Sequence, residues 1–487
     1  MTKKRTENDV IGQVKVPAEA YFGSFTARAH ENFQISGITA PDEFRVALGF
    51  IKKAAAQTNM ELGEFEAKHA NAIIKAADEF IVGKYNNHFT LDVFQAGAGT
   101  PFNMNANEII ANRANEILGV KKGKYSPITP NNHVNWGQSS NDVLPTAIRI
   151  AALIKQIELQ SEIEKLSKSL SKKATKFKDI LKVGRTHLQD AVPISLGQEF
   201  QAYSSAITRS NSYIKESFAH LLEVHIGGTA LGTGITTHPK YRPLIVNNLK
   251  KLTGLKLKAT KYPTELNHNM NAFSIASNSL KILANDLIRI SSDFTLLASG
   301  PDGGLNEITL PDVEPGSSIM PGKVNPSIAE CVTMVGYQVI GNDRTINLAV
   351  QNSQLELNVN TPVIMHNLLG SMEILTNACR MFRTKCIDHI TANKKECANL
   401  LSRSLCLATG LSPYLGYTVT AELVKEALKK DLSLYEVVSN KRFMDDTDLN
   451  QILSAKKIIS PANKDKPLIK KIQKNKNYQT YCKKIGI

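Results

Sequence analysis

The chain has 487 residues, of which 42% are hydrophobic, and its formal net charge is +15. This length exceeds what one hydrophobic core normally holds, so the composition predicts a globular protein of several domains. No apolar run reaches the roughly 18 residues that a membrane-spanning helix needs, and the basic start lacks the apolar segment of a secretory signal. We therefore expect a cytoplasmic protein without a membrane partner.

The positive charge gathers toward the C-terminal end, where lysines dominate the sequence after Leu449. Such a basic tail is one footprint of nucleic-acid binding. No nucleic-acid-binding motif accompanies it, and a solvated, lysine-rich tail explains the charge more simply. A positive field also favours small anionic substrates. We expect a substrate of that kind and no nucleic-acid partner.

Cysteine usage and short motifs exclude several cofactor classes. The six cysteines form no CxxC pair and no zinc-type spacing, so free thiols are expected. The chain also lacks the HExxH, P-loop and dinucleotide-binding motifs. The sequence therefore gives no support for chemistry that depends on a metal, ATP or NAD.

The elements predicted along the chain divide it into three regions. Residues 1–140 mix shorter helices with turn-rich segments. Residues 141–395 carry long amphipathic stretches, and residues 396–487 return to shorter helices before the basic tail. The shift in helix length predicts an N-terminal domain, a central helical domain and a small C-terminal domain.

Long helices dominate the central region. Apolar residues recur there every three or four positions, as Leu159, Ile163 and Leu166 do. The helices predicted on this basis cover residues 142–176, 189–221, 268–300, 326–351 and 355–393. A helix of 30 residues extends about 45 Å, so such helices are expected to pack side by side in a bundle, including across subunits. The predicted fold class is mainly α-helical.

Four polar stretches interrupt these helices. They are QAGAGTPFNMNANE with Thr100, HVNWGQSSND with Ser139, Ser140 and Asn141, GRTHLQDAVP with Thr186 and His187, and PGSSIMPGKVNPS over residues 315–327. Each alone is explained as a turn or a helix cap. Together they supply hydroxyls, amides, one imidazole and one ammonium, with almost no carboxylate. That inventory suits a dianion, and the N–H groups at the start of a helix would add positive partial charge.

The order and spacing of these stretches resemble the aspartase/fumarase superfamily. GSSIMPGKVNP is similar to the signature loop of that family, which is a highly specific string, and Arg5-x-Glu7-x-Asp9 resembles another family block. The resemblance extends from about residue 5 to residue 450. It implies a mainly α-helical, three-domain fold whose central bundle carries the signature loop. It also implies a homotetramer in which the bundles pack together and the active sites are shared between subunits.

Within this superfamily the chain most resembles the aspartate ammonia-lyase branch. The resemblance implies a carbon–nitrogen lyase that converts L-aspartate reversibly into fumarate and ammonia through an aci-carboxylate intermediate. QAGAGT is similar to the aspartase form, whereas Ser140 stands where aspartases usually carry threonine and is the fumarase-like choice. Fumarate hydratase and a related lyase with an altered substrate therefore stay open as alternatives.

The same resemblance implies that Ser317 is the base that removes the proton. A serine hydroxyl is too weak an acid to serve unaided, so loop amides and the Lys323 ammonium are expected to stabilise its alkoxide. Closure of the loop would expel water and strengthen these interactions. Gly316 and Gly322 are expected to permit unusual backbone angles in the loop.

The remaining roles also come from the resemblance. The implied catalytic residues are Ser317, His187, Lys323 and Glu330. Four hydroxyls are expected to hold the carboxylate that becomes the dianion, those of Thr100, Ser139, Ser140 and Ser318. The other carboxylate would be held by Lys323 and Asn325, and the amino group would be surrounded by Asn141, Thr186 and His187. Glu330 is expected to pair with His187 and set its tautomer.

The sequence also departs from the family pattern. Thr295 and Asp302 stand where the family has arginines, and His268 lies in a segment that does not resemble its family counterpart. These changes leave the substrate open. They also motivate a competing hypothesis, in which a catalytically reduced family member binds nucleic acid or an acidic partner through its basic tail. No cofactor is expected to be required, and the divalent-metal activation of some aspartases has no ligand spacing here.

Overall fold

The computed structural model describes residues 3–461 and 463–487. The chain forms two compact units, each assembled from three separate stretches of sequence. The first unit consists of Met1–Glu164, Arg209–Ile288 and Thr333–Cys379, and the second of Lys165–Thr208, Arg289–Val332 and Arg380–Ile487. The predicted division into three consecutive domains is a different partition of the chain, and it stays a prediction.

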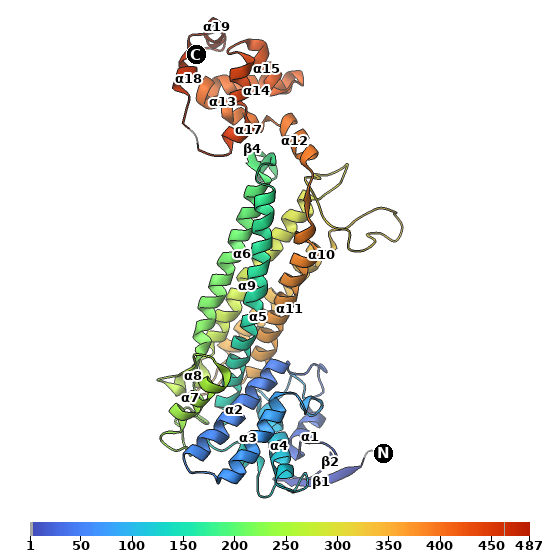
Figure 1. Ribbon diagram of the computed structural model, residues 1–487, viewed down its shortest axis with the longest axis vertical. Coiled ribbons are helices and arrows are strands. Elements are labelled where there is room, and N and C mark those ends of the chain that lie inside the picture. Colours follow the sequence, from blue (N-terminus) through green and yellow to red (C-terminus); the bar gives the residue numbers. More distant parts are fainter. Residues whose placement is uncertain (1–2, 462) are drawn as a thin grey trace. The chain divides into compact units, whose positions relative to one another are not determined.

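Helices predominate in both units, and five long helices contribute residues to both (Figure 1). These helices are α5 (Ser140–Lys176), α6 (Leu196–Phe218), α9 (Asn271–Leu297), α10 (Ser327–Gln351) and α11 (Thr361–Lys385). They confirm the long helices expected from the spacing of apolar residues. The stripe that predicted α5 is buried, since Leu159, Ile163 and Leu166 are each 0% exposed. Burial of one such side chain stabilises the fold by about 2 kcal/mol.

The prediction of helix over residues 189–195 was wrong. Gln189–Ser195 forms strand β4, which pairs antiparallel with β3 (Leu181–Thr186). Pro193 lacks the N–H that a helix interior requires, but it is accepted opposite Val183 at the edge of this two-stranded sheet. The resulting hairpin carries Thr186 and His187 at its turn.

Shorter elements complete the first unit. They are β1 (Lys4–Asp9), β2 (Gly12–Pro17), α1 (Ser24–Asn32), α2 (Asp42–Glu61), α3 (Ala67–Ile81), α4 (Thr100–Ile117), β5 (Glu223–Val224), α7 (Tyr241–Thr253), β6 (Lys258–Ala259) and α8 (Pro263–His268). Helix α2 packs against α3, α4 and α7, so it lies directly beside the helix that begins at Thr100.

The second unit also contains short strands and many short helices. They are β7 (Ile308–Thr309), β8 (Thr391–Ala392), α12 (Lys394–Arg403), α13 (Ala408–Leu415), α14 (Tyr417–Lys430), α15 (Leu434–Lys441), α16 (Asp446–Ile452), α17 (Ala455–Ile458), α18 (Lys466–Gln473) and α19 (Lys476–Lys484). Helices α13 to α16 and α18 surround a hydrophobic cluster of their own, which includes Leu411, Leu423 and Ile472. All six cysteines are free. Over the described residues, none of the helices combines the length and hydropathy that a bilayer span requires.

The family-like residues near the N-terminus build structure rather than a site. The Arg5 guanidinium donates to the Glu7 carboxylate and to four backbone carbonyls. The buried Glu108 carboxylate accepts hydrogen bonds from three backbone N–H groups at the start of α1 and from the Thr26 hydroxyl. An acidic group at a helix N-terminus is favourable, so these residues fix α1 against α4.

Candidate active site

The predicted site residues fall into two groups, one in each unit. Thr100, Ser139, Ser140 and Asn141 belong to the first unit. Thr186, His187, Ser317, Ser318, Lys323, Asn325 and Glu330 belong to the second. The two groups have different local surroundings.

The group in the first unit lines one open pocket of about 430 Å³, together with amide and hydroxyl side chains such as Asn103, Gln138 and Thr236. Thr100 and Ser140 are the first residues of α4 and α5. Two helix N-termini, each with positive partial charge, therefore meet at this pocket. None of the described lining residues is acidic. The pocket is consequently suited to an anion.

Close packing explains the two glycines of QAGAGT, the segment that leads into α4. A Cβ atom on Gly97 would lie 2.0 Å from the backbone oxygen of Val359. Gly99 precedes α4 with a φ of +67°, and its Cβ would lie 2.9 Å from Leu144 Cγ. These close approaches hold the start of α4 against α5 and against the segment before α11, which places Thr100 in the pocket.

A buried carboxylate fixes the start of α5. Asp142 accepts a hydrogen bond from the Ser139 N–H at 2.9 Å, while Ser139 Oγ accepts one from the Asn141 N–H at 3.3 Å. This reciprocal arrangement resembles a capping box. The other Asp142 oxygen accepts from the N–H groups of Gly227 and Thr229, each at 2.9 Å. Burial raises the Asp142 pKa to about 7, although these donors oppose the shift.

A buried lysine that the sequence reasoning missed lies behind the pocket. Lys52, on α2, is 0% exposed. Its Nζ donates to amide oxygens of Asn103 at 2.6 Å, Gln138 at 2.9 Å and Asn135 at 3.2 Å. Burial lowers the Lys52 pKa to about 7, while the nearby Asp142 carboxylate favours the ammonium.

A signal for Lys52 was present in the sequence. Lys52 is four residues after Leu48 and three before Ala55, so it shares the buried face of an amphipathic helix. A lysine at such a position is rarely buried without a polar partner. The partners themselves come from α4 and from the segment before α5, and helical spacing alone does not identify them.

Asn141 is held by two contacts of its own. Its side-chain Nδ2 donates to the Ala230 carbonyl at 2.9 Å, which leaves Oδ1 as the acceptor of this side chain. Its backbone oxygen accepts from Nε2 of the buried His225 at 3.1 Å. Burial lowers the His225 pKa to about 4, so this imidazole is neutral near pH 7. An amide oxygen held in place in this way can accept a hydrogen bond from a substrate amino group.

In the second unit, Thr186 and His187 lie at the exposed tip of the β3–β4 hairpin. Thr186 pairs with Gln189, and the two residues between them, His187 and Leu188, have φ values of 56° and 58°. A non-glycine residue in this left-handed region costs on the order of 1 kcal/mol. Such strain tends to persist where function requires it.

A cluster of buried charges supports this hairpin. Arg185 Nη1 donates to both oxygens of the fully buried Glu307 at 3.0 Å. Lys182, also buried, pairs with Glu307 at 3.1 Å and with Glu199 at 2.7 Å. Glu307 directly precedes β7, which leads into the signature loop. The cluster therefore joins the base of the hairpin to the base of that loop.

Strand β7 ends at Thr309, and residues 310–326, which include most of the signature loop, contain no helix. Within it, Ser317 Oγ accepts hydrogen bonds from the N–H groups of Met320 at 3.0 Å and Ile319 at 3.3 Å. Two donors aimed at one oxygen lower the free energy of its deprotonated form. Both donors therefore favour a negative charge on the Ser317 oxygen.

The two glycines of the loop are required for different structural reasons. Gly322 has a φ of +81°, as the expectation of unusual backbone angles required. At Gly316 the reason is close packing instead, because a Cβ atom would lie 2.2 Å from the Lys323 backbone oxygen. Asn325 Nδ2 also donates to the Gly316 carbonyl. Gly316 and Asn325 thereby hold the two ends of residues 317–324 close together, and we call this contact the neck of the loop.

The loop beyond this neck is exposed. Ile319 is 92% exposed, and Lys323 and Ser318 are exposed as well. Glu330, in the first turn of α10, is also exposed, and among the described residues it forms no ion pair or hydrogen bond with His187. The pairing of Glu330 with His187 stays a prediction, as do the roles assigned to the other loop residues.

The positions that depart from the family pattern have ordinary local surroundings. Thr295 Oγ1 donates to the Ser291 carbonyl within α9. Asp302 is exposed in a turn and forms no ion pair with any described residue. His268 is the last residue of α8, and its backbone oxygen accepts from the Ser353 hydroxyl. Nothing in these contacts assigns a catalytic role to the three residues.

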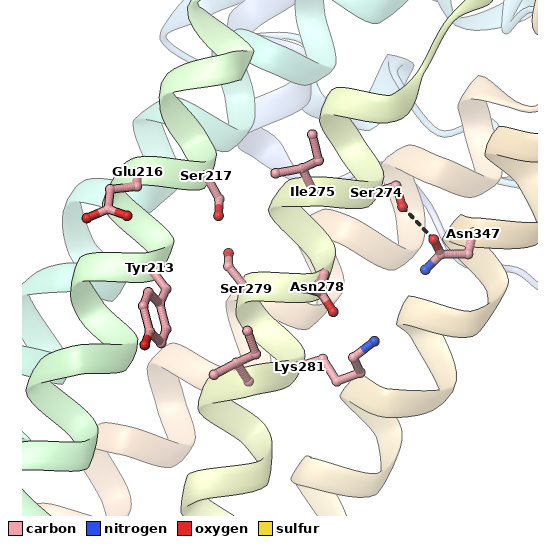
Figure 2. Close-up of a pocket in the computed structure, with 10 residues that line it drawn as sticks. Tyr213, Glu216, Ser217, Ser274, Ile275, Asn278, Ser279, Lys281 and Asn347 are labelled. Atoms are coloured by element: carbon pink, nitrogen blue, oxygen red, sulfur yellow. Dashed lines mark hydrogen bonds between the residues drawn. The ribbon is translucent and has the colours of Figure 1, made fainter.

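Another open pocket, of about 430 Å³, lies beside α6, α9 and α10 in the first unit (Figure 2). Ser217 on α6 and Ser279 on α9 point toward each other, and a hydrogen bond joins Ser274 to Asn347. This pocket contains none of the predicted site residues. Among the described residues, no three His, Cys, Asp or Glu side chains gather as a metal site.

Comparisons with known proteins agree on one family. A family model described as a lyase matches residues 12–341, and one described as the fumarase C C-terminus matches residues 407–460. The chain is 43% identical to the aspartate ammonia-lyase of Bacillus subtilis over 467 residues, 96% of this chain and 98% of that protein. It is 46% identical to a class II fumarate hydratase of Nitrosomonas europaea over 439 residues, 90% of this chain and 95% of that protein.

A solved structure shows the same fold. The crystal structure of a fumarate lyase:delta crystallin from Brucella melitensis bound to cobalt has a TM-score of 0.92 and 43% sequence identity, and the match covers 94% of this chain and 100% of that chain. The fold and the matched families define a lyase. The chain belongs to the aspartase/fumarase superfamily, as the resemblance of its polar stretches predicted.

Proposed function

We propose that this protein is an aspartate ammonia-lyase, which converts L-aspartate reversibly into fumarate and ammonia. The observation that carries the proposal is the pocket of hydroxyl and amide side chains where α4 and α5 begin, in a chain 43% identical over 467 residues to an aspartate ammonia-lyase. Hydroxyls, amides and two helix N-termini line this pocket, and these are groups that hold a carboxylate without competing for its charge.

The carboxylate beside the acidic carbon is held by the hydroxyls of Thr100, Ser139 and Ser140, with Ser318 added from the signature loop. Negative charge builds up on this carboxylate as the proton leaves. Donors aimed at developing charge act mainly in the transition state, and each contributes about 3 kcal/mol to lowering the barrier. The backbone contacts of Asp142 hold Ser139 in place, so little reorganisation is needed during the reaction.

Ser317 is the base that removes the proton. The N–H groups of Ile319 and Met320 already point at its Oγ, which supports an alkoxide at that atom. Closure of the exposed loop over the substrate brings Ser317 to the carbon atom and excludes water. The neck at Gly316 and Asn325 keeps the ends of the moving segment together.

The leaving group and the second carboxylate are contacted by the remaining residues. Asn141 Oδ1 accepts from the amino group, and Thr186 and His187 approach it from the hairpin tip. Lys323 and Asn325 hold the second carboxylate. Glu330 sets the tautomer of His187 once the two are brought together. No cofactor takes part in these steps.

The complete site is formed in a homotetramer, to which different subunits contribute the two groups of residues. The helix α10 supports self-association, because Met334, Tyr337 and Leu348 are 61%, 62% and 45% exposed on it. Large apolar side chains that recur along one helix face usually contact a partner. Association through the long helices is therefore the assembly that we propose.

A fumarate hydratase, which acts on malate, is the second candidate. It is favoured by the relative from Nitrosomonas europaea, which is 46% identical over 439 residues, and by Ser140 in place of the usual aspartase threonine. Both enzymes would use the same carboxylate pocket and the same base. They differ in the group that leaves the neighbouring carbon.

The test is an ultraviolet assay of fumarate formation from L-aspartate and from L-malate, run side by side with the purified protein. Ser317→Ala is the control for background activity. The proposal predicts turnover of aspartate and little or none of malate. Turnover of malate alone would establish the second candidate, and turnover of neither would require a different amino-acid or succinyl substrate.

A further inference from the structure

The buried Lys52 has an unusual set of partners. Each of its three hydrogen bonds goes to a neutral amide oxygen, on Asn103, Gln138 and Asn135. Among the described residues, no carboxylate forms an ion pair with it. A buried ammonium without a paired carboxylate is costly, so a merely structural position would usually carry an apolar side chain instead. This cost suggests that the charge serves the pocket in front of it.

The ammonium fixes the direction of the amides around it. An ammonium only donates, so the Asn103 side chain must turn its oxygen to Lys52 and its Nδ2 away. That Nδ2 donates to Asn135 Oδ1 at 3.0 Å and to Ser140 Oγ at 3.2 Å. The neighbouring cation therefore decides which end of the Asn103 amide faces Lys52.

The orientation of the Asn103 amide in turn decides whether the Ser140 hydroxyl accepts or donates a hydrogen bond. The lone pair on Nδ2 of Asn103 is delocalised into the amide, so Ser140 Oγ can accept a hydrogen bond from Nδ2 but cannot donate one to it. Among the described residues, Asn103 is the one hydrogen-bond partner of Ser140 Oγ. The hydroxyl proton of Ser140 therefore remains available to the pocket that Ser140 lines.

We propose that Lys52 is a positioning residue, which acts through Asn103 to make the Ser140 hydroxyl a hydrogen-bond donor toward a carboxylate in this pocket. The inference rests on the proposed function, because it assumes that the pocket binds a dicarboxylate. Lys52 does not touch the substrate itself. It makes the Ser140 hydroxyl donate toward the substrate. Its positive charge also adds to the field of the two helix N-termini.

Asn103→Asp is the sharpest variant, because it keeps the shape of the side chain and gives Lys52 an ionic partner. The new oxygen in place of Nδ2 accepts a hydrogen bond, so the Ser140 hydroxyl turns to donate to it. Fumarate binding, measured by calorimetry, is expected to weaken roughly 10- to 100-fold, the range expected for losing a donor to a charged group. Lys52→Met is expected to weaken binding to a similar extent, with kcat reduced more than KM is raised.

A double-mutant cycle separates this relay from simple charge repulsion. In a Ser140→Ala background there is no hydroxyl to redirect, so Asn103→Asp should have little further effect on fumarate binding. Lys53→Met is the matched control, since Lys53 is the next residue on α2 and pairs with Asp78 instead. It should bind fumarate as the wild type does. Circular dichroism would show whether each variant is folded, and Asn103→Asp keeps the test valid if Lys52→Met does not fold.

The outcomes distinguish the inference from the proposed function. An Asn103→Asp effect of equal size with and without Ser140 would overturn the relay, as would unchanged fumarate binding in both variants. Wild-type protein that binds fumarate but turns over neither aspartate nor malate would contradict the proposed function alone. Wild-type protein that binds no fumarate would overturn both.

Discussion

The pocket of the first unit and the signature loop of the second are built in opposite ways. Behind the pocket, the buried Lys52 and Asp142 make six hydrogen bonds to amide oxygens and backbone N–H groups. The loop carries Ser317 at a half-buried position and leaves Ile319 and Lys323 exposed. Under the proposed function, the groups that hold the substrate would be fixed before it arrives, whereas the base would be delivered by a segment with few contacts.

The largest expected effect comes from the loop. Ser317→Ala removes the proposed base, and kcat should fall by at least about 10³-fold. The melting temperature should stay within about 1 °C of the wild type, since the Ser317 hydroxyl accepts its hydrogen bonds from within the loop. Steady-state kinetics and calorimetric melting check both values. Retained activity in this variant would remove the assignment of the base.

A change in Asp142, behind the pocket, should instead lower the stability of the protein. Asp142→Asn replaces one acceptor oxygen by an amide, so at least one of three buried N–H groups loses its partner. The free energy of unfolding should fall by about 3 kcal/mol. Urea unfolding measures this loss, and Asp78→Asn on the partly exposed Lys53 pair is the control, with an expected change below about 1 kcal/mol. Equal losses in both variants would contradict a special role for Asp142.

The buried His225 of the first unit should make its own contribution to the pH dependence of stability. The pKa of the buried His225 is lowered from 6.5 to about 4, so the unfolded chain takes up this proton at a higher pH than the folded protein. The unfolded state is therefore favoured as the pH falls from 6.5 toward 4, and the stability present above pH 6.5 is lost. Between pH 7.5 and 5 this loss is about 2 kcal/mol.

His225→Gln keeps a donor for the Asn141 carbonyl and removes the titration. Urea unfolding of the wild type and the variant at pH 7.5 and 5 compares the two losses. Between these two pH values, the variant should lose about 2 kcal/mol less stability than the wild type does. If the wild type and the variant lose stability in parallel, His225 does not titrate as its burial requires.

The smallest expected effect concerns the neck of the loop. Gly316→Ala places a Cβ against the Lys323 backbone, which should displace the loop and lower kcat about 10-fold. Gly322→Ala meets no atom within 4 Å, so it should act only through its φ of +81°, at a cost of about 1 kcal/mol. Initial rates of the two variants test the distinction. A larger loss at Gly322 would show that backbone angle, and not the neck, governs the loop.

Much of this arrangement was visible in the sequence. The apolar stripe through Leu159 and Ile163 predicted α5, and a helix cap was one explanation of the Ser-Ser-Asn stretch before it. Strand β4 was missed because its short stretch carries no strong alternation and depends on pairing with β3. Lys52 and Asp142 were missed for a related reason, since their partners lie on other elements. Gly227, which Asp142 contacts, is 85 residues away in the sequence. Local patterns predict elements and caps, but buried polar networks require the tertiary structure.

The central claim is the release of ammonia from L-aspartate, and one measurement tests it directly. Purified protein is incubated with L-aspartate, and fumarate and ammonia are quantified in the same sample over time. The account predicts that both appear in equal amounts, and that neither appears with Ser317→Ala. Fumarate formed from malate, with no ammonia released from aspartate, would contradict it.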